Sequence, residues 1–284
     1  MSSSLSSSTA PAPSSPRLTP RPFGPTGLDV APLALACNYG IDADGVERAF
    51  HELGVNLFFV TPRMSAGVEG IRRLVRAGHR DKIVLVSTLT IPLGFRVGPF
   101  WERSAKTFGV DTIDVLLLGW VRSRWYTGGR TWPAMQRLKD EGKVRALGIS
   151  IHDRPLARAL VDELRLDVLM CRYNAAHRGA EREIFSTLGP RRPAILAYTA
   201  TRWGGLLKPQ DGLGPMTGPE CYRFVLGHPA VDATLCGAGS FAELQANAAG
   251  VLEGPLPEPR LEEVRRFGDA VRSTAVSRVG FGGG

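Results

Sequence analysis

The chain has 284 residues, of which 43% are hydrophobic and 22% charged, so it is long enough to bury a full core without disulfides or metal. Its net charge is +8, but the arginines alternate with acids and no helix-turn-helix, zinc-finger or RNA-recognition signature is present, so we expect no nucleic-acid partner. No apolar run reaches the roughly 18 residues of a membrane span, and the N-terminus does not read as a secretory signal.

The two ends of the chain differ in composition from the rest. Residues 1–20 are rich in Ser, Pro and Ala, and have too few apolar side chains to offset the entropy of ordering, which predicts a disordered tail. The glycine-rich residues 276–284 are expected to be flexible. One domain is therefore predicted over 21–275.

Short apolar runs recur through this domain, each the length of a strand and rich in Val, Ile and Leu. Such runs are typical of parallel strands that are buried on both faces. They cover residues 32–37, 55–60, 83–87, 113–118, 144–150, 167–171, 194–198 and 231–236.

Amphipathic stretches with helical spacing lie between the runs. They cover residues 45–53, 68–78, 132–142, 156–164 and 241–252. Gly54, Gly78 and Gly142 stand where helix C-caps belong. The alternation predicts an α/β fold of the (β/α)₈ TIM-barrel type. A doubly wound sheet is the alternative, but residues 37–40 do not form the glycine-rich turn that it needs after its first strand.

The four cysteines, Cys37, Cys171, Cys221 and Cys236, have no metal-ligand spacing, and we expect no bound metal. Three of them lie in or directly after apolar runs, where a free cysteine behaves as a small buried hydrophobe. Reduced thiols of this kind predict a cytoplasmic protein, although a nucleophilic cysteine stays open as an alternative.

Several segments, in order and spacing, resemble the aldo-keto reductase superfamily. RPFGPTGLDVAPLALA (21–36) resembles the family's T-G-L-x-V turn into the first strand, and GKVRALGIS (142–150) its G-K-V-R-x-I-G-V-S segment. RYNAAHRGAERE (172–183), ILAYTATRWGGLL (195–207) and LCGAGSFAELQANAAGV (235–251) resemble the segments after the last three strands. The resemblance covers about residues 21–252 and implies carbonyl reduction with a nicotinamide cofactor, NAD(P)H.

The family's catalytic Asp, Tyr, Lys and His are missing from the matching positions. In the family the Tyr protonates the carbonyl oxygen, the Lys and Asp lower its pKa, and the His orients the substrate. The matching positions hold Phe59 or Val60, Met64 or Ser65, Ser87 and Thr88, and Gly119.

The cofactor side of the resemblance is mixed, because Ile151 and Cys171 stand where the family has an Asn and a Gln. Ser150 matches the family's carboxamide-contacting Ser, Tyr198 the Tyr that stacks on the nicotinamide, and Asn247 an adenine-contacting Asn. Gly237 and Ser240 offer phosphate donors before a predicted helix. Glu243 stands near the position of a common Arg and would repel a 2′-phosphate, so the choice between NADH and NADPH stays open.

His152 and Tyr173 are the candidate replacements for the lost proton donor. His152 follows a strand end and has an ordinary pKa near working pH. The structural alternative is a loop histidine beside Asp153, which would cap the next helix. Tyr173, next to Arg172, is either a tuned acid or a structural residue, as its Tyr-Asn pair is in the family.

Arg63, Arg172 and Arg202, with Trp120, are the candidate substrate-binding residues, because guanidinium groups at one mouth suit an anionic ligand. They are ordinary surface side chains if they point outward.

We expect an oxidoreductase that binds a nicotinamide nucleotide and reduces a small carbonyl compound with a non-standard proton donor. The alternatives are an inactive nucleotide-binding or regulatory barrel, and a non-redox enzyme for an anionic metabolite.

Overall fold

Eight parallel strands close into a barrel in which each strand pairs with its neighbours in chain order and the last, β10, pairs with the first, β3. The computed structural model describes residues 16–210 and 212–280 of the chain. The strands are β3 (Leu33–Ala36), β4 (Leu57–Phe59), β5 (Val84–Leu89), β6 (Ile113–Val121), β7 (Val144–Ile151), β8 (Val168–Arg172), β9 (Ala194–Tyr198) and β10 (Ala233–Cys236). The predicted (β/α)₈ barrel is confirmed, with each predicted apolar run supplying one strand.

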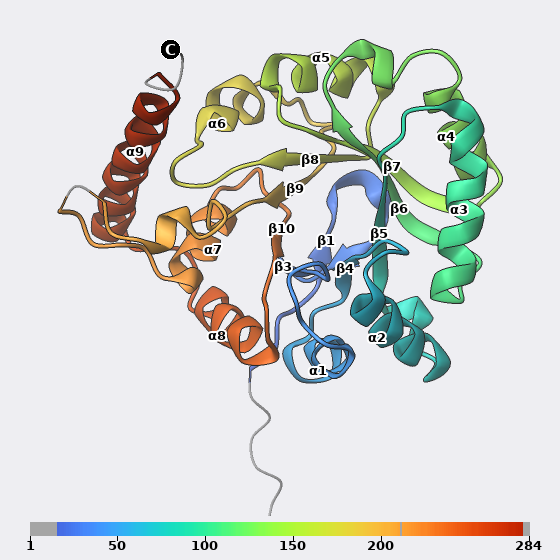
Figure 1. The fold of residues 1–284 in the computed structure, drawn as a ribbon, viewed down its shortest axis with the longest axis horizontal. Helices are drawn as coiled ribbons and strands as arrows, with labels where there is room; N and C mark the ends of the chain where they lie inside the picture. Colours follow the sequence, from blue (N-terminus) through green and yellow to red (C-terminus); the bar gives the residue numbers. More distant parts are fainter. Residues whose placement is uncertain (1–15, 211, 281–284) are drawn as a thin grey trace, which may run out of the picture.

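The helices surround the strands, and α9 stands at the outside of the ring (Figure 1). They are α1 (Ala43–Leu53), α2 (Ser65–Arg76), α3 (Gly94–Phe108), α4 (Thr131–Asp140), α5 (Arg154–Leu164), α6 (Gly179–Glu183), α7 (Gly218–Leu226), α8 (Phe241–Leu252) and α9 (Glu258–Gly280). All five predicted helices are present. Gly54, Gly78 and Gly142 follow α1, α2 and α4 in the left-handed conformation that ends a helix.

Alternate residues of each strand belong to two separate hydrophobic clusters. The inner cluster fills the barrel with side chains such as Ala34, Val86 and Leu196. The outer cluster packs residues such as Leu35 and Leu85 against the helices. Because side chains alternate along a strand, the parity of a position decides whether it points into the barrel or outward.

A short hairpin of β1 (Arg21–Pro22) and β2 (Asp29–Val30) lies against the start of the barrel strands. Phe23 is fully buried in the inner cluster, and the Arg21 guanidinium donates to the backbone carbonyls of Val231 and Asp232. The hairpin therefore plugs the N-terminal end, which leaves the C-terminal ends of the strands as the open mouth.

The predicted terminal segments fall partly outside the described residues, namely 1–15 and 281–284. Leu18, inside the predicted tail, is buried, and its backbone N–H donates to the Leu53 carbonyl. At the other end, α9 continues to Gly280. In the part of the chain that the structure describes, no helix is long and apolar enough to cross a membrane.

Candidate active site

A pocket of about 950 Å³ opens at the C-terminal ends of the barrel strands. This volume lies at the upper end of the usual range for small-molecule and cofactor sites, roughly 300–1,000 Å³. Its base is formed by inward-facing strand residues, and its walls by the loops that follow β3, β4, β5, β6 and β9 and by one face of α3. The base and near wall include Ala36, Phe59, Thr88, Ser150, Met170, Tyr198 and Leu235.

The barrel interior offers no acid, lysine or histidine at the positions of the family's catalytic residues. Phe59 lines the pocket, whereas Val60 belongs to the outer cluster, so Phe59 stands at the acid position. Met64 and Thr88 also line the pocket, while Ser87 is fully buried on the other face of its strand. The four missing groups are thus replaced by largely apolar side chains.

Gly119 and Thr88 fit against each other across neighbouring strands. A Cβ atom on Gly119 would lie 2.3 Å from the γ-methyl carbon of Thr88. The Thr88 side chain is buried, and its hydroxyl has no hydrogen-bond partner in the structure. The space that a histidine side chain at position 119 would need is therefore already filled.

Tyr198 and Ser150, buried at the base of the mouth, form a polar group with His152, which is exposed at its edge. The Tyr198 hydroxyl lies 3.0 Å from Nδ1 and 3.1 Å from Nε2 of His152. The two rings meet edge to face, with centroids 5.4 Å apart. Ser150 is buried beside them and is a hydrogen-bond partner of Tyr198. The sequence predictions for all three residues thus converge on one place.

Both titratable groups of this site are held in their neutral forms. Burial raises the pKa of Tyr198 well above its ordinary value, and the Cys171 sulfur raises it further, while Arg172 and Ser150 lower it. Burial lowers the pKa of His152, and the positive charges of Arg172 and Arg122 lower it further. Of the two, only His152 can gain a proton on its side chain as the pH falls.

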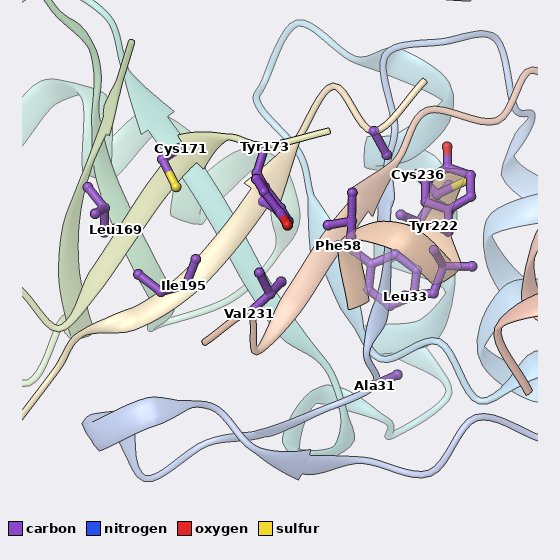
Figure 2. Close-up of a cluster of buried hydrophobic side chains, with 14 of the residues drawn as sticks. Ala31, Leu33, Phe58, Leu169, Cys171, Tyr173, Ile195, Tyr222, Val231 and Cys236 are labelled. Carbon is purple, nitrogen blue, oxygen red and sulfur yellow. The ribbon is translucent and has the colours of Figure 1, made fainter. Parts of the chain in front are cut away.

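Tyr173 points away from the mouth. It follows β8 with the parity of Leu169 and Cys171, and all three lie in the outer cluster (Figure 2). Its hydroxyl donates to a carboxylate oxygen of Glu181 at 2.7 Å, and burial and this carboxylate raise its pKa strongly. The structure does not bring Tyr173 to the pocket, and strand parity is the sequence signal that separates it from Tyr198.

The loop between β10 and α8 is closed by its own side chains. Ser240 caps α8 by accepting from the Glu243 backbone N–H, and the Glu243 carboxylate accepts from the backbone N–H of Gly239 at 2.8 Å. Gly237 lines the pocket under the Tyr39 ring. Asn247 is buried and its amide contacts the Cys236 sulfur at 3.5 Å, so it does not line the pocket.

The candidate substrate-binding residues divide into two groups. Arg63 and Trp120 line the mouth pocket. Arg172 and Arg202 do not; their charges act instead on His177, which lies half-buried near them. Burial and this positive field lower the pKa of His177 to about 4. Neither arginine has a carboxylate partner within the described residues.

Sequence reasoning missed two further arginines at the mouth. Arg96 and Arg103 stand two turns apart on α3, and with Pro99 and Phe100 between them they form the helix face that lines the pocket. No helix was expected over 94–108, because Gly94, Gly98 and Pro99 all disfavour one. The helical spacing of the two arginines was the available signal.

Backbone strain is concentrated around the mouth. Five non-glycine residues in the described ranges have a positive φ. Four of them are at the mouth: Trp120 lies near the end of β6, and Thr199, Arg202 and Trp203 follow β9. The fifth, Arg165, ends α5. Strained conformations of this kind persist where the surrounding structure enforces them, and they gather at ligand sites.

The four cysteines are free and buried. Burial raises the pKa of Cys37, Cys171 and Cys221 to about 12 and that of Cys236 to about 11. They are therefore uncharged thiols packed in the core, and none lines the mouth pocket.

Comparison with known proteins shows similarity to one family. The sequence model of the Aldo/keto reductase family matches residues 96–220, somewhat less than half of the chain. A protein of Pseudomonas aeruginosa assigned as an aldo-keto reductase is similar in structure, with 25% identity, a TM-score of 0.68, and coverage of 82% of this chain and 94% of that one.

The holo form of an aldo-keto reductase from Bacillus halodurans gives a TM-score of 0.74 over 88% of this chain and 96% of its own, at 19% identity, which shows the fold alone. No curated protein shows significant similarity to the sequence. The resemblance read from the sequence, and the barrel that it implied, are confirmed.

Proposed function

We propose that this chain, which is similar to aldo-keto reductases in its barrel and in the sequence of residues 96–220, is a divergent member of that superfamily. We propose further that it binds a nicotinamide nucleotide at the barrel mouth and reduces the carbonyl group of a small molecule. The observation that carries the proposal is the contact of Tyr198 with His152, beside Ser150, at the base of a pocket of about 950 Å³. It supplies the polar groups that hydride transfer to a carbonyl requires.

The nicotinamide end of the cofactor fits the residues present. Ser150 and Tyr198 line the pocket at the strand ends where the family resemblance expects a carboxamide contact and a stacked ring. Met170 and Leu235 add apolar surface beside them. When bound there, the nucleotide would supply the hydride, and Ser150 and Tyr198 would hold and orient its ring.

The adenosine end favours NADH over NADPH. The Glu243 carboxylate accepts from the Gly239 N–H and so already places a negative charge in the loop where a 2′-phosphate would bind. Ser240 is engaged as a helix cap, and Asn247 is buried against Cys236. NADH has no 2′-phosphate, so Glu243 would not repel it. Because Ser240 and Asn247 are already engaged, they would offer a 2′-phosphate no contact that compensates for this repulsion.

His152 is the proposed proton donor, and Tyr198 positions it. Both are within hydrogen-bond reach of each other and line the pocket, whereas Tyr173 donates to Glu181 outside the barrel. No lysine lies beside Tyr198, so nothing lowers its pKa enough to make it the acid. His152 would donate from its protonated form, whose population rises as the pH falls.

The assay that tests this proposal follows NADH oxidation with a panel of aldehydes and dicarbonyl compounds. His152→Gln is expected to lower kcat at pH 6 about 100-fold or more, because general acid catalysis contributes roughly 10²–10⁴-fold. His51→Gln, on the exposed face of α1, is the matched control and keeps wild-type turnover. Equal turnover in His152→Gln and wild type would exclude His152 as the donor.

A second function, binding of the nucleotide without catalysis, is favoured by one observation. The pKa of Tyr198 is raised and that of His152 lowered, and both shifts make proton donation at neutral pH harder. This alternative gives saturable NADH binding with no hydride transfer at any pH between 5 and 8.

The cytoplasmic location expected from the sequence stays a prediction. The four buried free thiols are consistent with a reducing compartment.

A further inference from the structure

We infer that the mouth is built for an amphipathic carboxylate, whose acid group is held by Arg96 and Arg103 of α3 and by Arg63, and whose apolar body lies between Trp120 and Trp203. The inference rests on the proposed function, because it names the class of substrate that the same pocket takes. It adds residues of α3 and the loop after β9 that the family resemblance does not supply.

Three unpaired arginines give the rim of the pocket a positive charge. Arg63, Arg96 and Arg103 all line it, all are exposed, and none has an ion-pair partner within the described residues. Some arginines elsewhere are paired, as Arg73 is with Asp44 and Glu47, so these three are distinguished by their place around the pocket together with their lack of a partner. Arginines left without a carboxylate partner around a concave site are suited to bind one from a ligand, with two parallel hydrogen bonds.

The negative charge in the pocket comes from the start of α8, beside the loop after β10 where we propose that the nucleotide binds. Glu243 is the acidic residue among those that line it, and its carboxylate already accepts from the Gly239 N–H. It therefore does not neutralise the α3 face. A ligand anion placed near Arg96 and Arg103 gains the attraction of three guanidinium groups, and among the described residues that line the pocket it meets no carboxylate there.

Large apolar side chains also line the pocket and are unusually exposed. Trp120 is 55% and Trp203 63% exposed, and Ile91 and Leu207 beside the same pocket are 46% and 40% exposed. Exposed apolar residues gathered around one cavity mark a ligand or partner site, whereas scattered ones do not. An aromatic or branched hydrocarbon body covers this surface.

Both tryptophans have a strained backbone conformation. Trp120 has a φ of 50° and Trp203 a φ of 51°, in the left-handed region that bulky residues rarely adopt. Trp120 also lies where the register of β6 against β7 shifts between Leu118 and Val121. A strand irregularity next to a site re-aims a side chain, so the strain at Trp120 is an independent sign of a ligand.

The two ends of the pocket set the arrangement of the ligand. The reacting carbonyl lies near His152 and Tyr198 at the base, and the carboxylate lies at the arginine rim. A substrate that reaches both therefore carries its carbonyl and its carboxylate on opposite ends of an apolar spacer.

The test is a binding titration with naphthalene-2-carboxylate and with its neutral isostere naphthalene-2-carboxamide, followed by isothermal calorimetry with and without NADH. Neither probe is reduced, so binding is measured apart from hydride transfer. Wild type is expected to bind the carboxylate about tenfold more tightly, which corresponds to roughly 1.4 kcal/mol. The preference disappears in Arg96→Gln/Arg103→Gln and persists in Arg72→Gln, whose arginine is exposed on α2 and outside the pocket.

Trp120→Ala separates the apolar wall from the charged rim, because it weakens both probes equally. Equal affinity of wild type for the two probes, or a carboxylate preference that survives the double arginine change, overturns the inference. If NADH binds but the carboxylate preference is absent, the substrate class alone is wrong. If the preference is present but NADH does not bind, the proposed function is wrong and the anion site stands.

Discussion

Thr88 fills the space in front of Gly119, so that a Cβ on the glycine would lie 2.3 Å from the threonine γ-methyl. This relationship shows that the family's catalytic positions are repacked as well as substituted. A histidine at position 119 and the threonine at position 88 cannot both keep their places. Any chemistry at this mouth must use groups from other strands.

Gly119→Ala is expected to destabilise the protein by about 1–3 kcal/mol, because the added methyl overpacks a filled site. The Leu89 carbonyl oxygen, 3.2 Å from the same point, limits relief by backbone movement. The combination with Thr88→Ala recovers part of the loss. Urea unfolding of both single variants and the double variant measures this coupling, and additive changes would contradict direct contact.

Tyr173→Phe separates a structural role from a catalytic one. The change removes a hydrogen bond of 2.7 Å to the Glu181 carboxylate, which lowers the free energy of unfolding by about 1–2 kcal/mol. The turnover of the folded protein stays at the wild-type level, since Tyr173 does not line the pocket. Thermal unfolding measures the loss of stability, and steady-state kinetics on the same preparation measure turnover. A large loss of kcat would show that Tyr173 takes part in catalysis.

The pH dependence of carbonyl reduction follows the protonation of His152. Burial and the charges of Arg172 and Arg122 hold its pKa below the ordinary 6.5. We therefore expect kcat/KM to rise as the pH falls below 6.5 and to level off below the lowered pKa. His152→Gln loses this acidic limb; a variant that keeps the same profile would assign the limb to another group.

Glu243→Gln is expected to improve NADPH binding about 2- to 5-fold and to leave NADH binding unchanged, because an exposed charge contributes up to roughly 1 kcal/mol. The amide oxygen keeps an acceptor for the Gly239 N–H, so the loop holds its shape. Parallel titrations with the two nucleotides measure the ratio. An unchanged ratio means that this side chain does not face the 2′ position.

His177 is expected to make the fold less stable in acid. Burial and the charges of Arg172, Arg202, Arg272 and Arg154 lower its pKa from 6.5 to about 4. Between these values the unfolded chain binds a proton that the folded one does not, so stability falls as the pH drops from about 6.5 to about 4.

His177→Gln reduces this acid-side loss, and His51→Gln does not. Urea midpoints at pH 6.5 and 4.5 give the comparison. A loss of equal size in the His177 variant and wild type would show that other groups cause it.

The barrel could be predicted from the sequence because its strands are buried on both faces and stand out as unbroken apolar runs. The helix α3 could not, since Gly94, Gly98 and Pro99 lower its helix propensity and only packing against the barrel stabilises it. Arg96 and Arg103 were missed for that reason.

The candidate site was predicted in part. Ser150, His152 and Tyr198 come together because β7 and β9 lie on either side of β8, and side chains from alternate strands of a barrel meet at its mouth. Tyr173 follows an outward-facing position, which the alternation along β8 would have shown. The burial of Asn247 away from the pocket could not be predicted. It depends on a contact between α8 and Cys236 of β10, and no local sequence pattern indicates such a contact.

The most direct test of the central claim is an equilibrium titration of the full-length protein with NADH, followed by quenching of tryptophan fluorescence. Trp120 and Trp203 line the pocket and serve as reporters. We expect saturable binding with a Kd in the micromolar range, weakened about tenfold or more by Tyr198→Ala, because this change removes the ring that we propose stacks on the nicotinamide. No saturation below millimolar NADH would contradict a nucleotide site at this mouth.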